Sequence, residues 1–385
     1  MTAAPTTAVD LTAVRAVEFP VAGCCAYFNH ASDSPVPSRA ARAITERVAL
    51  LQDPLLEVRP REDYLRDAQA RLGCLLGVPP TQIAFLTNVA DATATIANGL
   101  DWRAGDEVVL VAGEFATFVY PWQNLDRLGV RSVFVPKDGA ATDLDRVESA
   151  LSPRTRAVAI SHVEYQHGFR NDLAALGRLC RDRDLLLVVD ASQSLGVYDL
   201  DMAALGVDAV VAIGYKWLMA PHGIAVLAVG ESTLDRCRPT APGRYSVAAG
   251  WETDDYALNW HPDARRYQGG ALNWIGVTAL AESLGLLAEV GPRAVEREAI
   301  AVADRLVAGL REGPATLTSD PRAAHRSQIV SFTLGSTETD EAFVQRALAA
   351  GVVLGRRGFG VRFGAQFWNT ADEVDRLLDL TRTSR

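Results

Sequence analysis

Short apolar runs alternate with helical stretches through the middle of this 385-residue chain, and this alternation constrains the fold more than any other feature. Most neighbouring runs are separated by roughly 12–20 residues with helical spacing and turn residues. Continuous apolar strands that alternate with helices are typical of a mostly parallel sheet with helices on both faces, so we predict an α/β fold with about seven strands. The expected strands are Ile83–Leu86, Val108–Val111, Val133–Val135, Ala157–Ile160, Leu185–Val189, Ala209–Ile213 and Ile224–Val229.

The sequence changes character after the last of these strands, which predicts a second, smaller unit. Residues 239–273 contain three prolines and show no clear period, so we expect a long ordered loop there, and such loops in compact enzymes are usually functional. Further on, we expect two helices, two strands and a capping box that opens the final helix. These elements are Trp274–Val290, a helix ending near Arg311, Ser327–Leu334, Val361–Phe363 and Thr370–Glu373.

The predicted division is a large domain over residues 25–250 and a smaller α+β domain formed by residues 1–24 and 251–385. No Gly/Ser linker or long charge block separates the two parts. We therefore expect them to form one rigid unit.

Charge and cysteine usage exclude several classes of protein. The formal net charge of −9 argues against a nucleic-acid binder, and the longest apolar run falls short of the 18 or so residues that span a bilayer. Residues 1–10 have no basic segment followed by an apolar one, so we expect a cytoplasmic protein without a signal peptide. Five cysteines with no C-x-x-C spacing argue against a disulfide framework or a structural zinc site, and we expect no metal.

The most informative stretch runs from Leu185 to Gly223. One apolar strand ends in Asp190, and the next ends just before Lys216, 26 positions later and about one strand–helix–strand unit away. In a parallel sheet both side chains then emerge at the carboxyl edge, where open α/β sheets hold their ligands. A lysine that can form a Schiff base and an aspartate that can pair with a pyridinium suit pyridoxal 5′-phosphate (PLP). Taken singly, Asp190 could be a helix cap and Lys216 a solvated lysine.

These two motifs, DASQSLG and GYKWLMAPHG, resemble the class V aminotransferase family of fold-type I PLP-dependent enzymes. That group includes cysteine desulfurases, C–S lyases and isopenicillin N epimerase-like proteins. The resemblance extends over nearly the whole chain, through segments that look like the family's N-terminal strand and turn, its cofactor-stacking segment, the strand before the aspartate, a loop to a partner subunit and a substrate strand. These segments are Tyr27–Ala31, Glu114–Trp122, Ser161–Gly168, Tyr267–Asn273 and Val361–Thr370.

The resemblance implies a role for each matching residue. Lys216 would hold PLP and carry protons, Asp190 would pair with the pyridine nitrogen, and Arg362 would clamp the substrate carboxylate. Further cofactor contacts would come from Gln193 at the ring hydroxyl, Phe115 stacked on the ring, the backbone of Val89 and Ala90 and the side chain of Tyr215 at the phosphate, and Gly270, Ala271 and Asn273 of the partner loop. The substrate would meet Asn29, His30, Gln166 and His222.

Partners follow from the same resemblance. The loop at residues 251–273, and Tyr267–Asn273 in particular, implies a homodimer with composite active sites and a small amino-acid substrate. Ala90 and Ala271 stand where many relatives have a threonine, so the phosphate would depend more on backbone amides and on Tyr215.

The reaction is narrowed by a missing cysteine. A desulfurase needs a thiolate nucleophile in the carboxyl-terminal part, whereas the last cysteine here is Cys237. The simplest remaining chemistry is C–S bond cleavage of cysteine or a cysteine S-conjugate by β-elimination through a quinonoid, in a setting such as natural-product biosynthesis. Epimerisation, transamination and decarboxylative oxidative deamination share that quinonoid and stay open as alternatives.

Two rival classes lack support in the sequence. A non-catalytic protein of this fold would normally lose Lys216, Asp190 or the carboxylate clamp at Arg362, and all three candidates are present. A dinucleotide-binding protein would need G-x-G-x-x-G after its first strand, and Thr87–Asp91 offers no such motif.

Overall fold

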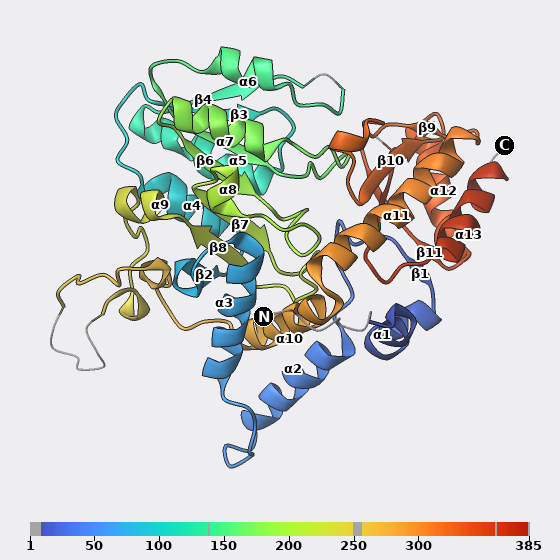
Figure 1. Cartoon of the computed structure of the whole chain (residues 1–385), viewed down its shortest axis with the longest axis horizontal. Helices are drawn as coiled ribbons and strands as arrows, with labels where there is room; N and C mark the ends of the chain where they lie inside the picture. The colour runs from blue at the N-terminus through green and yellow to red at the C-terminus, as the bar shows by residue number, and fades with distance from the viewer. Residues whose placement is uncertain (1–8, 138, 249–255, 359, 384–385) are drawn as a thin grey trace, which may run out of the picture.

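The structure is a computed structural model that describes residues 9–137, 139–248, 256–358 and 360–383. Residues 1–8 of the predicted smaller domain and 251–255 of the predicted loop lie outside the described ranges. Two units lie side by side, a large one built around a central sheet and a smaller one that carries the carboxyl terminus (Figure 1).

The central sheet of the large unit has seven strands in the order β2-β8-β7-β6-β5-β3-β4. Its core from β4 to β7 is parallel, while β8 runs antiparallel to both β7 and β2. The mostly parallel seven-stranded sheet predicted from the apolar runs is therefore confirmed. The strands are β2 (Ile83–Leu86), β3 (Glu107–Val111), β4 (Arg131–Val135), β5 (Thr155–Ser161), β6 (Leu186–Asp190), β7 (Ala209–Ile213) and β8 (Ala225–Val229).

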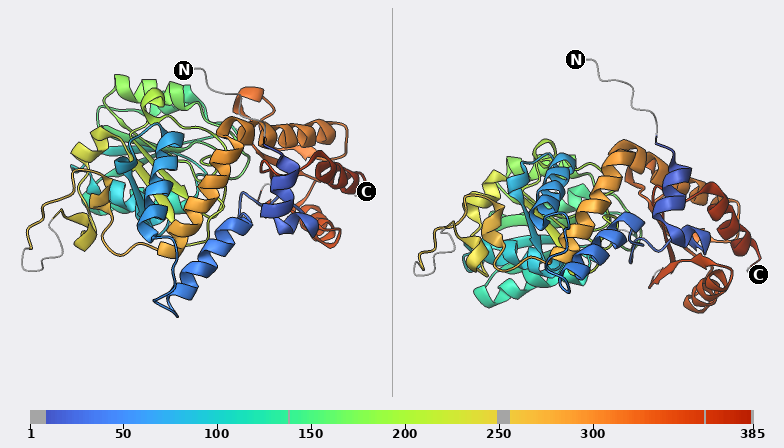
Figure 2. Two further views of the ribbon diagram at one scale, coloured as in Figure 1. Left: turned by 60° about the horizontal axis from the view of Figure 1, so that its bottom comes forward. Right: turned by 90° about the horizontal axis from the view of Figure 1, so that it is seen from below.

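Helices cover both faces of this sheet because its strands are apolar on both sides (Figures 1 and 2). One hydrophobic cluster joins one sheet face to α3 (Arg61–Leu76), α6 (Leu144–Ala150), α7 (Leu173–Asp182), α8 (Met202–Leu205) and α10 (Trp274–Val290), and α2 (Ser38–Leu50) packs along α10. A second cluster joins the other face to α4 (Val89–Gly99) and α5 (Ala116–Gln123). The short α9 (Glu231–Arg236) follows β8.

The smaller unit is an α+β structure with a four-stranded antiparallel sheet in the order β12-β13-β10-β9. Its strands are β9 (Thr316–Leu317), β10 (Ile329–Thr333), β12 (Gly355–Arg357) and β13 (Gly360–Gly364), and β1 (Ala26–Tyr27) pairs with β11 (Val352–Val353). The helices are α1 (Leu11–Glu18), α11 (Pro292–Arg311), α12 (Thr337–Ala349) and α13 (Ala371–Arg382). Thr370 and Glu373 form the expected capping box at the start of α13.

Packing divides the units at slightly different residues from those predicted. The prediction placed residues 251–385 in the smaller domain, but α10 lies in the large unit's cluster because nearly all of its sides are apolar and buried against α2 and α3. Ala26 and Phe28, predicted for the large domain, belong to the hydrophobic cluster of the smaller one. The break between units therefore falls near Gly291, where the chain turns from α10 into α11.

No single helix in the described parts of the chain is long and apolar enough to cross a membrane. The helices α10 and α11 satisfy the length and composition requirement only as a pair, and they are bent by 83° relative to each other. The apolar character of α10 is explained by its buried position in the large unit.

Candidate active site

Lys216 and Asp190 lie at the carboxyl edge of the central sheet, as the strand pattern predicts. Asp190 is the last residue of β6, and Lys216 follows the end of β7, the neighbouring parallel strand. Both side chains line a cavity of about 280 Å³. The remaining lining residues are Asn88, Val89, Phe115, Thr117, Ser161, Val163, Tyr165, Ser192, Gln193, Ile213 and Tyr215.

Burial tunes both charged groups of this cavity. Desolvation lowers the pKa of Lys216 to about 8, against an opposing effect of the Asp190 carboxylate and with a further lowering by Arg362 and Arg357. Desolvation also raises the pKa of Asp190, while hydrogen bonding from Ser192, whose backbone N–H donates to Oδ1 at 2.7 Å, acts in the opposite direction. A lysine that loses its proton near neutral pH can act both as a nucleophile and as a base.

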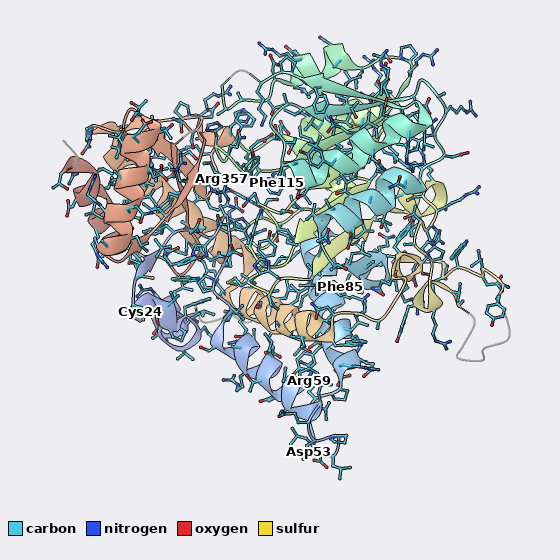
Figure 3. The ribbon with its side chains drawn as sticks, turned by 180° about the vertical axis from the view of Figure 1, so that it is seen from behind. Cys24, Asp53, Arg59, Phe85, Phe115 and Arg357 are labelled. Atoms are coloured by element: carbon cyan, nitrogen blue, oxygen red, sulfur yellow. The ribbon has the colours of Figure 1, made fainter. Side chains whose placement is uncertain are left out.

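An aromatic side chain from the large unit faces the lysine. The Lys216 ammonium lies 5.7 Å from the centroid of the Phe115 ring, and Phe115 meets Tyr165 edge-on with centroids 5.1 Å apart. Phe115 is 42% exposed, so one part of its ring is available to a bound group. Figure 3 shows Phe115 at the boundary between the two units.

The helix α4 begins at the wall of the cavity. Asn88 caps it by accepting a hydrogen bond from the N–H of Asp91 at 2.9 Å, and the first residue, Val89, lines the cavity. The N-terminus of a helix favours an anion such as a phosphate. Ala90, predicted beside Val89 as a phosphate contact, is not among the lining residues.

Arg362 enters from the smaller unit, on β13, and is 1% exposed. Its two terminal nitrogens donate to the carbonyl oxygen of Tyr165 and to the hydroxyl of Ser32, each at 2.7 Å, while its Nε–H has no protein partner. Asn29 lies close by: both its Oδ1 atom and the Nε atom of Arg362 are within 4 Å of the point where a Cβ atom at Gly355 would stand. The Oδ1 atom of Asn29 is also buried without a partner.

A buried carboxylate pair behind the cavity was not predicted. Glu114 accepts hydrogen bonds from both the backbone N–H and the hydroxyl of Ser161, a lining residue, and Glu164 pairs with Lys137 at 2.5 Å. Burial raises the pKa of both carboxyls. Asn171 ties the two together by donating to the carbonyl of Ser161 and to Glu164. Glu114 and Ser161 belong to segments that resemble the class V family. Lys137 lies outside those segments, and no sequence pattern marks it as part of the site.

None of the five predicted substrate residues is part of the cavity lining: Arg362 and Asn29 lie as described above, and the other three are placed as follows. His30 is fully buried, hydrogen-bonded through Nδ1 to Ser34 Oγ at 2.8 Å and packed edge-on against Trp368. Gln166 donates to the phenol of Tyr165 at 2.8 Å. His222 is exposed, pairs with Asp33 at 2.8 Å and stacks on Tyr215 with centroids 4.0 Å apart.

The predicted partner-loop residues also lie elsewhere in this chain. Gly270, Ala271 and Asn273 line a separate cavity of about 620 Å³. The side chain of Asn273 caps α10 by accepting from the N–H of Gly276 at 3.0 Å, and donates to the carbonyl of Gly223 at 2.9 Å. Within one chain, the three residues are therefore not part of the Lys216 cavity.

Comparison with known families identifies the protein family to which this chain belongs. Residues 61–377 match the family described as aminotransferase class V, so the chain belongs to that family. It is 30% identical over 379 residues to the isopenicillin N epimerase of Streptomyces clavuligerus, covering 91% of this chain and 92% of that one. It is 25% identical over 374 residues to a probable cysteine desulfurase of Methanothermobacter thermautotrophicus, with the same coverage.

Solved structures agree on the fold. A mutant of the enzyme C-DES with glycine covalently linked to its PLP cofactor superposes with a TM-score of 0.88 at 23% identity, over 96% of this chain and 99% of that one. The complex of the cystine C–S lyase C-DES with its product cysteine persulfide gives 0.87 at 24% identity, over 95% and 99%. The predicted fold-type I architecture is confirmed.

Pyridoxal 5′-phosphate is the cofactor of this family, and the observed residues fit it. Lys216 offers an amine of lowered pKa, Asp190 offers a buried carboxylate, and α4 offers a helix N-terminus for a phosphate, all around one cavity. A carboxylate without a positively charged group against it is costly at this depth, and a protonated pyridine nitrogen would supply that charge.

Proposed function

We propose that this enzyme cleaves the C–S bond of cysteine or of a cysteine S-conjugate by β-elimination. The observation that carries the proposal is the chemistry of the cavity lining, which contains one amine, Lys216, and one carboxylate, Asp190. All other polar side chains in that lining are hydroxyls or amides. If Asp190 serves the cofactor ring, Lys216 is left as the one amine in that lining that can take a proton from the substrate, and elimination needs one such base.

Each group has a defined task in this proposal. PLP supplies an electron sink that makes the α-proton of an amino acid acidic. Lys216 would hold the cofactor and, as a free amine, would take that proton, so that the electron pair of the broken Cα–H bond forms the Cα–Cβ double bond as the Cβ–S bond breaks. The thiol leaves after protonation, and water hydrolyses the resulting enamine to pyruvate and ammonium.

Other residues, of which Ala90 and Arg362 lie outside the cavity lining, would hold the cofactor and the substrate in this scheme. Gln193 would bind the ring hydroxyl, Phe115 would stack on the ring, and Val89, Ala90 and Tyr215 would hold the phosphate. Arg362 would take the α-carboxylate, supported by its unpartnered Nε–H, by its burial and by the absence of a carboxylate partner among the described residues.

The position of the cysteines supports elimination over desulfuration by a protein thiolate. Cys180 and Cys237 are buried, and burial raises the pKa of each thiol to about 12, which leaves them protonated. No cysteine follows Cys237 in the sequence. Cys24, between α1 and β1, and Cys74, on α3, are exposed and are not part of the cavity lining.

Epimerisation is the second candidate, favoured by the 30% identity to isopenicillin N epimerase over 91% of this chain. Reversal of a stereocentre needs a proton returned to the opposite face of the α-carbon. The Lys216 side of the cavity provides a base, whereas Phe115, which faces Lys216, carries no exchangeable proton. This asymmetry is why we place elimination first.

One experiment separates these reactions. The purified holoenzyme is incubated with L-cysteine, L-cystine, several S-conjugates and ordinary amino acids in D₂O, and pyruvate, ammonia, sulfide and stereochemistry are measured together. Elimination predicts pyruvate and ammonium in equal amounts from sulfur substrates. Deuterium at the α-carbon with inversion, and no pyruvate, would instead establish an epimerase.

We also propose a homodimer in which Tyr267–Asn273 reach the partner's site. These residues surround the 620 Å³ cavity of this chain and leave the Lys216 cavity without a contribution from them. Sedimentation velocity should give a dimer, and mixing Lys216→Ala chains with chains altered at Ala271 should restore part of the activity. A fully active monomer would contradict the proposal.

A further inference from the structure

A second arginine of the smaller unit points to the same place as Arg362. In the antiparallel pair β12–β13, Gly355 lies opposite Arg362 and Arg357 lies opposite Gly360. Directly opposite residues share a face, and so do alternate residues of one strand. Arg357 and Arg362 therefore project from the same face of the small sheet, with two glycines in between. Figure 3 shows Arg357 at the boundary between the units, as Phe115 is.

The two guanidinium groups meet at one hydroxyl. Ser32 Oγ accepts a hydrogen bond from Arg362 at 2.7 Å and from Arg357 at 3.2 Å. Arg357 also donates to the carbonyl oxygen of Arg356 at 2.9 Å. Among the described residues, no carboxylate forms an ion pair with either guanidinium, so every acceptor they have is a neutral oxygen.

The guanidinium groups of Arg357 and Arg362 together carry more positive charge than one α-carboxylate can balance. Arg357 lowers the pKa of both Lys216 and Arg362 through its charge, so it lies close enough to influence both. A guanidinium keeps its proton in a protein, and one carboxylate is matched by the fork of one arginine. If Arg362 takes the α-carboxylate, Arg357 is left as an unbalanced, half-buried cation beside the site.

We propose that the substrate carries a second anionic group, a carboxylate on its side chain, and that Arg357 binds it. This inference rests on the proposed function, because it assigns the α-carboxylate to Arg362. It defines the substrate as an amino acid or cysteine S-conjugate with a distal carboxylate, and it makes Arg357 a determinant of specificity. Arg362 is deeply buried and Arg357 is less so, which matches an α-carboxylate inside and a side-chain carboxylate nearer the mouth.

The test uses amino acids that bind without losing a β-substituent. L-Glutamate and L-2-aminoadipate are each compared with the amide of the same length, L-glutamine and the ω-amide of 2-aminoadipate. Dissociation constants are taken from the change in visible absorption of the holoenzyme on binding. We expect the carboxylate to bind at least about 10-fold more tightly than its amide in one of the two pairs, since hydrogen bonds between charged groups are the strong ones.

Three variants locate the effect. Arg357→Gln should bring the carboxylate-to-amide ratio close to one, while Arg362→Gln should weaken the acid and its amide by similar factors. Arg356→Gln is the matched control, because Arg356 is the next residue on β12 and its side chain belongs to the opposite face. It should leave the ratio as in the wild type.

Each other outcome overturns the inference. Equal affinity for acids and amides in the wild type would show that no second anion is recognised. An Arg357→Gln variant that weakens acid and amide equally would show that both arginines share the α-carboxylate. The proposed function is tested separately. It fails if the holoenzyme binds these amino acids but gives no pyruvate from any sulfur substrate, whatever its carboxylate-to-amide affinity ratio is.

Discussion

The indole N–H of Trp217 donates to the side-chain oxygen of Gln193 at 2.8 Å, and this contact fixes which way the glutamine amide points. An indole N–H can only donate, so the atom that it meets must be the amide oxygen. The amide nitrogen of Gln193 is then directed elsewhere and donates to the carbonyl of Ala31 at 3.0 Å. Its second N–H is left to the cavity that Gln193 lines, where the ring hydroxyl oxygen of PLP is expected.

Trp217→Phe should therefore weaken cofactor binding indirectly, through the orientation of Gln193. With the indole donor removed, only the hydrogen bond to the Ala31 carbonyl still orients the Gln193 amide, so the N–H that faces the cavity is held less firmly and a hydrogen bond worth about 0.5–1.5 kcal/mol is weakened. We expect the dissociation constant of PLP, measured by equilibrium dialysis of the apoprotein, to rise about 2- to 10-fold.

Trp122→Phe is the matched control for that change. Trp122 is equally buried in the large unit, but its indole N–H has no protein partner, so this variant loses ring area without losing a hydrogen bond. It should lower thermal stability and leave the affinity for PLP within about 2-fold of the wild type. Equal weakening of PLP binding by both variants would mean that Trp217 acts through packing alone.

The pH at which the apoprotein accepts PLP should report the environment of Lys216. Attachment requires the neutral amine, and burial together with Arg362 and Arg357 lowers the pKa of Lys216 to about 8 from a usual 10.5. We expect the rate of covalent attachment, followed by the appearance of visible absorption, to rise with pH and to level off above a midpoint near 8. Lys216→Ala should show no attachment at any pH.

Charge variants shift that midpoint in opposite directions. Asp190 stabilises the charged amine, so Asp190→Asn should lower the midpoint, and Arg357→Gln should raise it because a repulsive charge is removed. A midpoint that stays near 10 in the wild type, or that moves in the same direction in both variants, would refute this description of the site.

Asp190→Asn should also separate cofactor binding from turnover. In the wild type the N–H of Ser192 donates to Oδ1 of Asp190 at 2.7 Å, and the asparagine oxygen can accept the same hydrogen bond. The variant loses the negative charge that would hold a proton on the pyridine nitrogen. We expect PLP still to attach and kcat to fall by at least about 100-fold. Near-normal turnover of a PLP-loaded Asp190→Asn enzyme would remove Asp190 from its proposed role.

The central sheet was accessible from sequence because its signal is local. Each predicted strand is a continuous apolar run that can be recognised from its own residues, and Ile83–Leu86 and Ala209–Ile213 match β2 and β7 residue for residue. The division between units was less accessible. Helix α10 follows a loop and precedes the smaller unit in sequence, and only tertiary contacts with α2 and α3 assign it to the larger one.

The candidate site shows the same limit. Asp190 and Lys216 follow strands and could be placed at one edge by topology, since parallel strands end together. Ser32 and Arg357 meet across a sequence separation of 325 residues, and no local pattern announces such a contact. His30 illustrates the converse, because its position beside a predicted turn suggested a substrate contact, whereas the fold buries it against Trp368 and Trp217.

His30 should therefore influence stability against acid more than substrate binding. Burial lowers its pKa to about 3, below the usual 6.5 that the unfolded chain retains. Between those values the unfolded state binds more protons than the folded state, so stability falls as pH drops from 6.5 towards 3, by up to about 1.4 kcal/mol per pH unit for this one group. His30→Gln keeps a polar side chain that can bond Ser34 and does not titrate. We expect it to flatten the dependence of the urea midpoint on pH in that window, with KM for the substrate changed less than about 2-fold. An unchanged pH dependence together with a large rise in KM would return His30 to the substrate site.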